Sequence, residues 1–404
     1  MTDFAVLRAP SQVLFGAGMA AAAGRVAADH GRRVLVITDP IIASTPGFGT
    51  VIDSLSDLDV TIFQDAVVDV PRSAVDAAVA LGESVTPDVI VAVGGGSVID
   101  LAKVTALVLA HGGPLENYYA VQSVPGPVVP LIALPTTAGT GSEATPVSVV
   151  TDPATGMKIG VASPHLIPRH AICDPLLTLG APPVVTAHSG IDALSHAVEA
   201  YMAAREEPSV ELVLGRPQVG KNLLSDTLAL SAAGHIARNL VRAVEDGSDV
   251  EARTGMLYGS LLAGIAFGNS GVSAAHALQF AVGAATHTSH GLGTGLLLPY
   301  VMEFNRPARP AEIAELSALM GGDAVERVHA LGLQIGLPAS LAEIGVAQED
   351  LRPMAEASVG IKRLIDNNAR PLDADALEAI LDAAWHGDPE RLRGAKPRPA
   401  GSLR

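Results

Sequence analysis

Residues 88–100 read Asp88-Val-Ile-Val-Ala-Val-Gly-Gly-Gly-Ser-Val-Ile-Asp100. The apolar, β-branched beginning is typical of a strand buried on both faces of a parallel sheet. Three glycines and a serine follow directly, and we expect a helix to continue through Lys103. The free N–H groups and positive dipole end of such a helix attract an anion. The stretch therefore predicts a pyrophosphate site; a tight turn with Ser97 as N-cap is the alternative.

The chain up to residue 182 alternates strands and helices at the pace of βαβ units. Apolar runs predict strands at 32–39, 60–63, 88–93, 128–134 and 170–174, a helix at about 73–85, and an extended segment at 5–16. This order is typical of an open parallel sheet. We therefore expect a Rossmann-like α/β nucleotide-binding domain over residues 1–182.

Asp39 ends the strand predicted at 32–39. An acidic residue at the carboxyl end of such a strand can accept hydrogen bonds from a ribose diol, which favours NAD over NADP because a 2′-phosphate would be repelled. The alternative is that Asp39 caps a helix or turn.

A strand predicted at 128–134 leads into a loop rich in hydroxyl groups, Pro135-Thr-Thr-Ala-Gly-Thr-Gly-Ser-Glu143. Such a loop can bind a nucleotide through uncharged hydrogen bonds, although an ordinary turn rich in serine and threonine is the alternative. Residues 147–151 and 157–162 then resemble a hairpin that contains Lys158.

The chain becomes almost entirely helical after Pro182-Pro183. We therefore expect an all-helical domain at 183–404, with an exposed loop at 206–220 and a flexible tail from about 387. Residues 189–201 are predicted to form a helix that places Asp192 and His196 on one face, about 40° apart. Their oxygen and nitrogen can converge on one divalent cation, although a surface hydrogen bond or cap is the common meaning of this spacing.

Residues 254–302 contain no Asp, Glu, Lys or Arg, in a chain that is 17% charged. Three histidines lie in this run: His276, His287 and His290. Fourteen residues of unbroken helix span about 21 Å, so His276 and His290 can share an ion only if the chain bends between them. Glycines at 283, 291 and 293 allow that bend. The alternative is that these are core histidines bonded to backbone carbonyls.

Composition narrows the class of protein. The 404 residues suffice for two domains, and the net charge of −16 argues against binding to nucleic acid or an anionic membrane. No 18-residue stretch is purely apolar, and the N-terminus lacks the pattern of a signal peptide. The single cysteine, Cys173, fits a reducing cytoplasm.

The chain resembles the iron-containing (group III) alcohol dehydrogenase family over almost its full length, to about residue 385. Four motifs carry the resemblance: Gly94-Gly-Gly-Ser-Val-Ile-Asp-Leu-Ala-Lys103, Pro135-Thr-Thr-Ala-Gly-Thr-Gly-Ser-Glu143, Gly190-Ile-Asp-Ala-Leu-Ser-His-Ala-Val-Glu199, and His276 through His290 to Leu298-Pro-Tyr-Val-Met-Glu-Phe-Asn305. Their order and spacing together are highly specific.

The resemblance implies roles for the matching residues. The metal-ligand positions match Asp192, His196, His276 and His290. The cofactor-contact motifs match Gly95, Gly96, Ser97, Asp100, Thr136, Thr137 and Thr140, with Asp39 and Lys158 on the ribose side. The implied enzyme transfers hydride between NAD(H) and a small primary alcohol or aldehyde. It uses a divalent metal, Fe(II) first and Zn(II) second, and forms a homodimer.

Two departures from the family pattern bear on the chemistry. The family commonly has a histidine four residues after the first late ligand, assigned to proton relay, and this chain has Phe280 there. His287 is the nearest substitute. The usual Asn-Pro after the second strand is Val70-Pro71, preceded by Asp69.

Two other activities of the superfamily remain open from the sequence. One is a polyol oxidoreductase resembling glycerol dehydrogenase. The other is a lyase resembling dehydroquinate synthase, whose substrate needs Lys or Arg in the pocket. The run 254–302 and Phe280 favour a neutral, fairly apolar substrate instead. A binding protein without catalytic activity is the third alternative.

Overall fold

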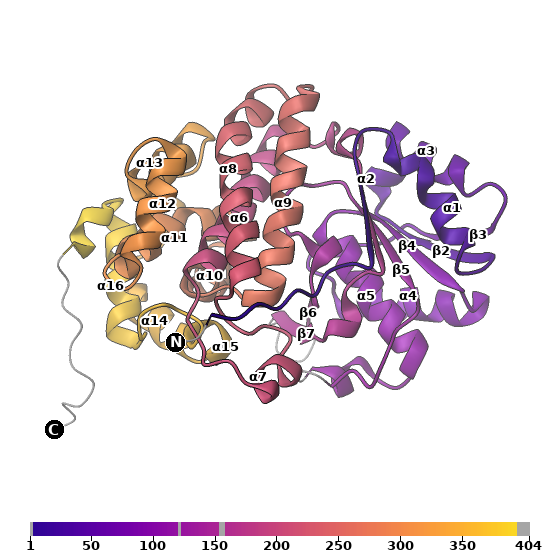
Figure 1. Ribbon diagram of the computed structural model, residues 1–404, viewed down its shortest axis with the longest axis horizontal. Helices are drawn as coiled ribbons and strands as arrows, with labels where there is room; N and C mark the ends of the chain where they lie inside the picture. Colours follow the sequence, from indigo (N-terminus) through magenta and orange to yellow (C-terminus); the bar gives the residue numbers. More distant parts are fainter. Residues whose placement is uncertain (1–2, 120–122, 153–157, 394–404) are drawn as a thin grey trace. The chain divides into compact units, whose positions relative to one another are not determined.

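The structure is a computed structural model that describes residues 3–119, 123–152 and 158–393 (Figure 1). Contacts divide the chain into two compact units. The first unit comprises residues 1–201 and 205–271, and the second comprises 202–204 and 272–404.

The first unit is built on a six-stranded sheet in which every neighbouring pair is parallel. Its strands are β1 (Gln12–Phe15), β2 (Arg33–Ile37), β3 (Asp59–Phe63), β4 (Val89–Gly94), β5 (Leu131–Pro135) and β8 (His170–Cys173). The spatial order is β1-β8-β5-β4-β2-β3. The predicted open parallel sheet is confirmed.

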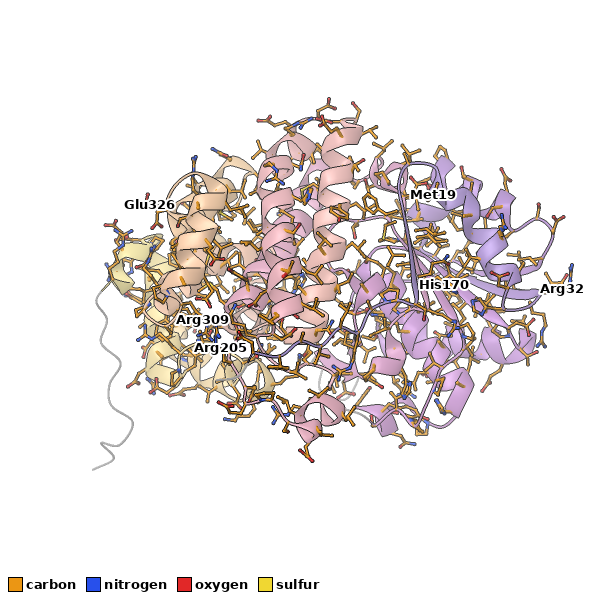
Figure 2. The ribbon with its side chains drawn as sticks, viewed as in Figure 1. Met19, Arg32, His170, Arg205, Arg309 and Glu326 are labelled. Carbon is orange, nitrogen blue, oxygen red and sulfur yellow. The ribbon has the colours of Figure 1, made fainter. Side chains whose placement is uncertain are left out.

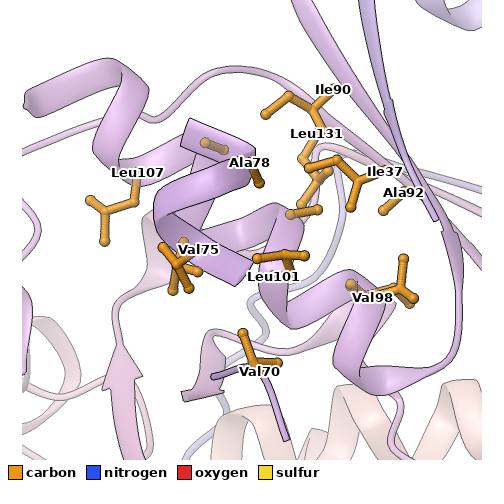
Figure 3. Close-up of a cluster of buried hydrophobic side chains, with 14 of the residues drawn as sticks. Ile37, Val70, Val75, Ala78, Ile90, Ala92, Val98, Leu101, Leu107 and Leu131 are labelled. Carbon is orange, nitrogen blue, oxygen red and sulfur yellow. The ribbon is translucent and has the colours of Figure 1, made fainter. Parts of the chain in front are cut away.

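Helices cover both faces of this sheet, and its central strands β4 and β5 are accordingly buried along their whole length. On one face, α4 (Arg72–Val85) and α5 (Gly96–His111) pack against the strands in the cluster of Figure 3. Leu101 of α5 and Val75 of α4 lie in that cluster. On the other face lie α1 (Ala23–Ala28) and α3 (Pro46–Ser54), whose Val51 is fully buried. The helix α2 (Pro40–Ala43) is a single turn.

The predicted hairpin is a separate two-stranded antiparallel sheet, β6 (Val147–Thr151) with β7 (Lys158–Ala162). Residue 157, included in the prediction, lies outside the described residues. The hydroxyl of Ser148 in β6 donates to the backbone carbonyl of Asp100 in α5 at 2.9 Å. The hairpin is thereby fixed to the helix that follows the glycine turn.

The rest of the first unit is helical: α6 (Pro183–Met202), α7 (Val210–Gly215), α8 (Leu223–Glu245) and α9 (Val250–Ser270). The helices α8 and α9 lie side by side (Figure 1). The expectation of a loop over 206–220 is wrong for its middle. Ser209 caps α7 by accepting from the N–H of Leu212 at 3.0 Å, and serine is a favoured N-cap residue.

The second unit is helical in every described element. It contains α10 (Ala274–Thr286), α11 (His290–Asn305), α12 (Pro310–Met320), α13 (Ala324–Gln334), α14 (Leu351–Val359), α15 (Lys362–Ile365) and α16 (Ala374–His386). The α/β plus all-helical fold class is confirmed. No single helix in the described residues is long and apolar enough to cross a membrane; only α9 and α10 taken together pass that test.

The predicted boundary at 182–183 coincides with the end of the sheet part, since β8 ends at Cys173 and α6 begins at Pro183. Contacts group α6 to α9 with the sheet. The domain boundary at 182–183 stays a prediction. The tail expected from about 387 begins with a 3₁₀ helix, Pro389–Leu392, whose Leu392 is buried. Residues 394–404 lie outside the described part.

The contact between α1 and α3 gives a stability prediction. A Cβ on Gly24 would lie 1.7 Å from the backbone carbonyl oxygen of Ser54, which no rotamer change can relieve. We expect Gly24→Ala to lower the free energy of unfolding by about 3 kcal/mol, measured by urea denaturation. Gly49→Ala in α3 is the matched control, because nothing lies within 4 Å of its Cβ position. The control should gain about 0.5–1 kcal/mol, and equal stability of the two variants would contradict the packing described.

Candidate functional site

The strand order of the sheet reverses between β2 and β4. The chain passes from β2 to β3 on one side and then returns to place β4 on the other side of β2. In open α/β sheets, ligands bind outside the carboxyl ends of the strands at such a switch point. Asp39 follows β2 and the glycine turn follows β4, so both lie at this position.

The glycine turn is formed as an anion site requires. The N-cap of α5 is Gly95, which provides no side-chain cap, so the alternative in which Ser97 is the N-cap is wrong. The hydroxyl-rich loop packs against this turn: a Cβ on Gly96 would lie 2.5 Å from Thr140 Cγ2, and one on Gly95 would lie 3.4 Å from Thr137 Oγ1. Thr136, the second residue of that loop, donates its N–H to the carbonyl of Gly94 at 3.1 Å. The structure thus brings the two predicted cofactor motifs together.

Asp39 caps a helix, which was the alternative interpretation of this residue in the sequence. It is the N-cap of α2, and its Oδ1 accepts from the N–H groups of Ile41 and Ile42, both at 2.9 Å. These bonds use one carboxylate oxygen. Oδ2 remains for a ribose, so capping and cofactor binding are compatible.

Lys158 and Asp69 form an ion pair of 2.6 Å. The N–H of Asp69 also donates to the hydroxyl of Ser97 at 3.4 Å, and its carbonyl accepts from Thr151. Both Asp69 and Val70 have positive φ, at 66° and 43°, which is costly for a β-branched residue. This strained turn therefore links the glycine turn to Lys158. Asp69 was not predicted as a site residue, and its departure from the family pattern was the only signal.

A buried charged group, which we call the Lys103 cluster (Asp100, Lys103 and Glu143), lies behind these motifs. The Lys103 ammonium donates to the carbonyl of Thr145 at 3.0 Å, to its hydroxyl at 3.0 Å and to the carbonyl of Val147 at 2.7 Å. Lys103 is fully buried and Glu143 is 1% exposed. The cluster joins α5 to the end of the hydroxyl-rich loop.

Asp100 is held by protein groups on both of its oxygens. Ser142 Oγ donates to Oδ1 at 2.6 Å and the N–H of Val149 donates to Oδ2 at 2.8 Å. Asp100 therefore fixes the loop and the hairpin to α5. Its direct contact with the cofactor stays a prediction.

Burial sets the protonation of the Lys103 cluster. It lowers the pKa of Lys103 to about 8 against the opposing attraction of Asp100 and Glu143. It raises the pKa of Glu143 to about 7 and also raises the pKa of Asp100. Sequence reasoning did not single out Lys103 or Glu143 for any role. The available signal was a charged residue, Lys103, three positions after Asp100 in an otherwise apolar helix.

The loop also approaches α6 closely. A Cβ on Gly139 would lie 2.6 Å from the Cβ of Ser189, and the Gly139 carbonyl lies 3.3 Å from Nδ1 of His196. A carbonyl only accepts, so Nδ1 carries the proton and the Nε2 lone pair points elsewhere. His196 Nε2 lies 3.9 Å from Asp192 Oδ2, and the ring stacks on Phe267 at 4.2 Å. A metal-binding imidazole is oriented by this kind of carbonyl contact.

The second unit holds the other predicted ligands as a pair. The helix α10 ends at Thr286 and α11 begins at His290, so the predicted bend is confirmed. The rings of His276 and His290 have centroids 5.3 Å apart. His287 is the C-cap of α10 with φ 56°, and the Phe280 ring lies 6.5 Å from that of His290.

The glycines near the bend have a different purpose from the one predicted. Gly283 and Gly293 lie within the two helices, and a Cβ on Gly293 would lie 1.4 Å from Gln279 Oε1. A Cβ on Gly283 would lie 2.7 Å from Gln279 Nε2. They make room for the Gln279 side chain between α10 and α11, while residues 287–289 form the bend.

Comparison with known families agrees with these features. The family model "Iron-containing alcohol dehydrogenase" matches residues 10–175, and "Fe-containing alcohol dehydrogenase family, C-terminal" matches residues 217–385. The chain belongs to the iron-containing alcohol dehydrogenase family. The predicted resemblance is confirmed, and the protein is an oxidoreductase of the alcohol dehydrogenase type.

Individual relatives cover nearly the whole chain. Long-chain-alcohol dehydrogenase 1 of Geobacillus thermodenitrificans is 35% identical over 90% of this chain and 91% of its own. NAD-dependent methanol dehydrogenase of Bacillus methanolicus is 33% identical over 88% of this chain and 93% of its own length. The crystal structure of a 1,3-propanediol oxidoreductase is 31% identical, with a TM-score of 0.88 over 95% of this chain and 100% of that one. The family implies NAD and a divalent metal, and the lyase and binding-protein alternatives lose support.

The Lys103 cluster gives a pH-dependent prediction. In the unfolded chain a glutamate has its ordinary pKa of 4.5, whereas burial raises that of Glu143 to about 7. Between these pH values the folded protein retains a proton that the unfolded chain releases. The Glu143 contribution to the free energy of unfolding therefore falls as the pH rises through this window, by roughly 3 kcal/mol in all.

Glu143→Gln removes that titration. Urea unfolding at pH 5, 6 and 7 should show a smaller decline with pH in the variant than in the natural protein. The exposed Glu83→Gln variant is the matched control and should follow the natural protein. Parallel pH dependences of all three would contradict the assignment of a buried, protonated Glu143.

Proposed function

We propose that this protein is an NAD(H)-dependent, metal-dependent alcohol dehydrogenase that interconverts small primary alcohols and aldehydes. The observation that carries the proposal is the contact of His196 with Gly139. It joins a helix with two metal-type donors to the hydroxyl-rich loop that packs on the glycine turn. A redox cofactor and a metal are thereby served by adjoining segments of one unit.

We infer that Asp192, His196, His276 and His290 together hold the divalent cation. Asp192, His276 and His290 are of the donor types that can hold a metal ion. Asp192, His196 and His276 are 3–5% exposed, so an ion bound by them would be shielded from bulk water. Family membership favours Fe(II), whereas three imidazoles and one carboxylate suit Zn(II) as well. When bound, such an ion polarises the substrate oxygen as a Lewis acid.

The residues of the chain would then position the cofactor. Gly95, Gly96 and the N–H groups at the start of α5 would bind the pyrophosphate, with Ser97 beside them. Thr136, Thr137 and Thr140 would contact the nucleotide through hydroxyl groups, and Asp39 and Lys158 the ribose side. Asp100 would hold this surface in place from behind. The nicotinamide ring accepts or donates the hydride.

The substrate is proposed to be neutral and fairly apolar. The charge-free run 254–302 offers no cation for a carboxylate or sulfonate, and Phe280 contributes a bulky apolar ring. His287 is exposed and is the proposed substitute for the family's relay histidine at position 280. Among the relatives, those named for long-chain alcohols, methanol or 1,3-propanediol fit this chemistry better than the one named for sulfoacetaldehyde.

The assembly proposed is a cytoplasmic homodimer. Its support is the closed symmetry of most soluble oligomers and the position of β1, an edge strand of the sheet that could pair with a second copy. Light scattering coupled to size exclusion would decide between one and two copies.

The reaction is tested by NADH oxidation against short aldehydes with apo-protein reloaded separately with Fe(II) and Zn(II). Turnover restored by one ion would identify the metal and rank the substrates. No turnover with either ion, despite measurable NADH binding, would contradict the proposed activity.

His276→Ala tests the ligand set. Loss of one ligand should lower metal affinity by more than about 100-fold, a larger effect than the loss of a supporting hydrogen bond. Activity should disappear, while NADH binding followed by fluorescence should change by less than about twofold because the cofactor motifs lie at 94–100 and 135–143. His386→Ala is the control, since its exposed imidazole bonds within its own helix. Retained metal and activity in His276→Ala would refute the assignment.

Asp39→Asn separates the charge of Asp39 from its cap. Asn is an equally good N-cap, so α2 should remain intact. Without the negative charge, kcat/KM for NADPH should rise by about tenfold or more, which corresponds to roughly 1.4 kcal/mol of repulsion removed. Asp39→Ala, which also loses the cap, is the comparison for stability. An unchanged preference for NADH in Asp39→Asn would show that Asp39 does not face the ribose.

A further inference from the structure

A groove of about 730 Å³ lies at the amino ends of β5 and β8, the end of the sheet opposite to the glycine turn. Its lining includes His30, His165, His170, Arg169 and Asp29. Three imidazoles in one groove need an explanation, and neither the cofactor nor the proposed catalytic metal provides one.

His30 and His170 point their Nε2 atoms at each other, 2.8 Å apart. His30 follows α1, and His170, labelled in Figure 2, is the first residue of β8. Their ring centroids lie 5.0 Å apart with an interplanar angle of 62°. In this arrangement two nitrogens share one proton, and the same two nitrogens can share a metal ion.

The tautomer of His170 is set by Gln12. Nδ1 of His170 lies 3.0 Å from Gln12 Oε1, an amide oxygen that only accepts. Nδ1 therefore carries the proton, and Nε2 of His170 offers its lone pair toward His30. Metal-binding histidines usually donate their other ring N–H to an oxygen in this way.

We propose that His30 and His170 form a second metal site, for a divalent transition ion such as Zn(II), Cu(II) or Ni(II), which stabilises the first unit. An ion bound at about 2.0–2.1 Å to two imidazoles at a tetrahedral angle holds their nitrogens about 3.3 Å apart. The pair needs to open by only about 0.5 Å to accept such an ion. Water and the nearby carboxylate of Asp29 would complete the coordination.

The charges around the pair select the class of ion. Burial and Arg169 lower the pKa values of His30 and His170, opposed by Asp29, so both rings stay neutral and able to ligate near neutral pH. Arg8 and Arg169 line the same groove and make it unfavourable to Mg²⁺ or Ca²⁺, which bind through charge and oxygen ligands. Ions that bond strongly to imidazole are favoured instead.

Such an ion would link the end of α1 to the start of β8, two segments that are far apart in the sequence. His30 follows α1 on one face of the sheet, and His170 begins β8, which pairs with the edge strand β1 through Gln12 and His170. Binding to the folded state alone raises stability with ion concentration. The site is independent of the proposed catalytic ligands.

The test uses holoenzyme that already carries its catalytic metal, titrated with Cu(II) and with Zn(II). We expect one further equivalent to bind, with a Cu(II) paramagnetic resonance spectrum that shows two nitrogen ligands, and with a rise in the melting temperature in Zn(II). His30→Gln and His170→Gln should each lose this equivalent and the melting shift, while alcohol dehydrogenase activity stays unchanged.

Two further variants keep the test decisive. His111→Gln is the matched control, since this imidazole of the same unit bonds to the carbonyl of Gly126 and should not affect the second site. Gln12→Leu keeps both imidazoles and should weaken binding by about 10–100-fold, which a variant that merely misfolds would not mimic. The proposal is overturned if the natural protein and His30→Gln bind the same number of equivalents, or if the spectrum of the extra ion shows no imidazole nitrogen.

Discussion

The proposed cofactor surface depends on one buried ammonium group. Lys103 is fully enclosed and places its three donors on Thr145 and Val147, the residues that join the hydroxyl-rich loop to β6. Taking a charge out of water costs several kcal/mol unless hydrogen bonds and opposite charge replace the solvent. Here the oxygens of Thr145 and Val147 replace the solvent, and Asp100 and Glu143 attract the ammonium where they are ionised. The loop is thereby held against α5, and its threonines lie on the glycine turn.

The same loop transmits this order to the proposed metal ligands. Gly139 has no side chain, which permits its close approach to Ser189 of α6, and its carbonyl fixes the tautomer of His196. A larger residue at position 139 would push α6 and the His196 imidazole away from the loop. The proposed metal would then shift relative to the proposed cofactor site. The positions of Lys103, Gly139 and His196 therefore form one chain of constraints, each of which is a contact within the first unit.

The sequence predicts the sheet, the helical second half and the proximity of Asp192 to His196 because periodicity and spacing report local structure. Asp192 and His196 are close because four residues make about one helical turn. The residues that were missed depend on contacts across the fold. Lys103 and Glu143 are 40 residues apart in sequence, and no periodicity indicates that they enclose each other's charge. Gln279 likewise explains two glycines that were assigned to a bend, because the volume of a side chain between two helices is a tertiary property.

Phe280 replaces the relay histidine in a part of the chain that has no charged side chains. Over residues 254–302 no side chain carries a permanent charge, and imidazole is the side chain there that is suited to proton transfer near neutral pH. Phe280 stands on α10 where the family commonly has an imidazole, and His287 is the C-cap of that same helix, in a left-handed conformation. Proton transfer through an exposed residue uses bulk water directly. Under the proposal that His287 takes the relay role, the proton step would depend on solvent access to the end of α10.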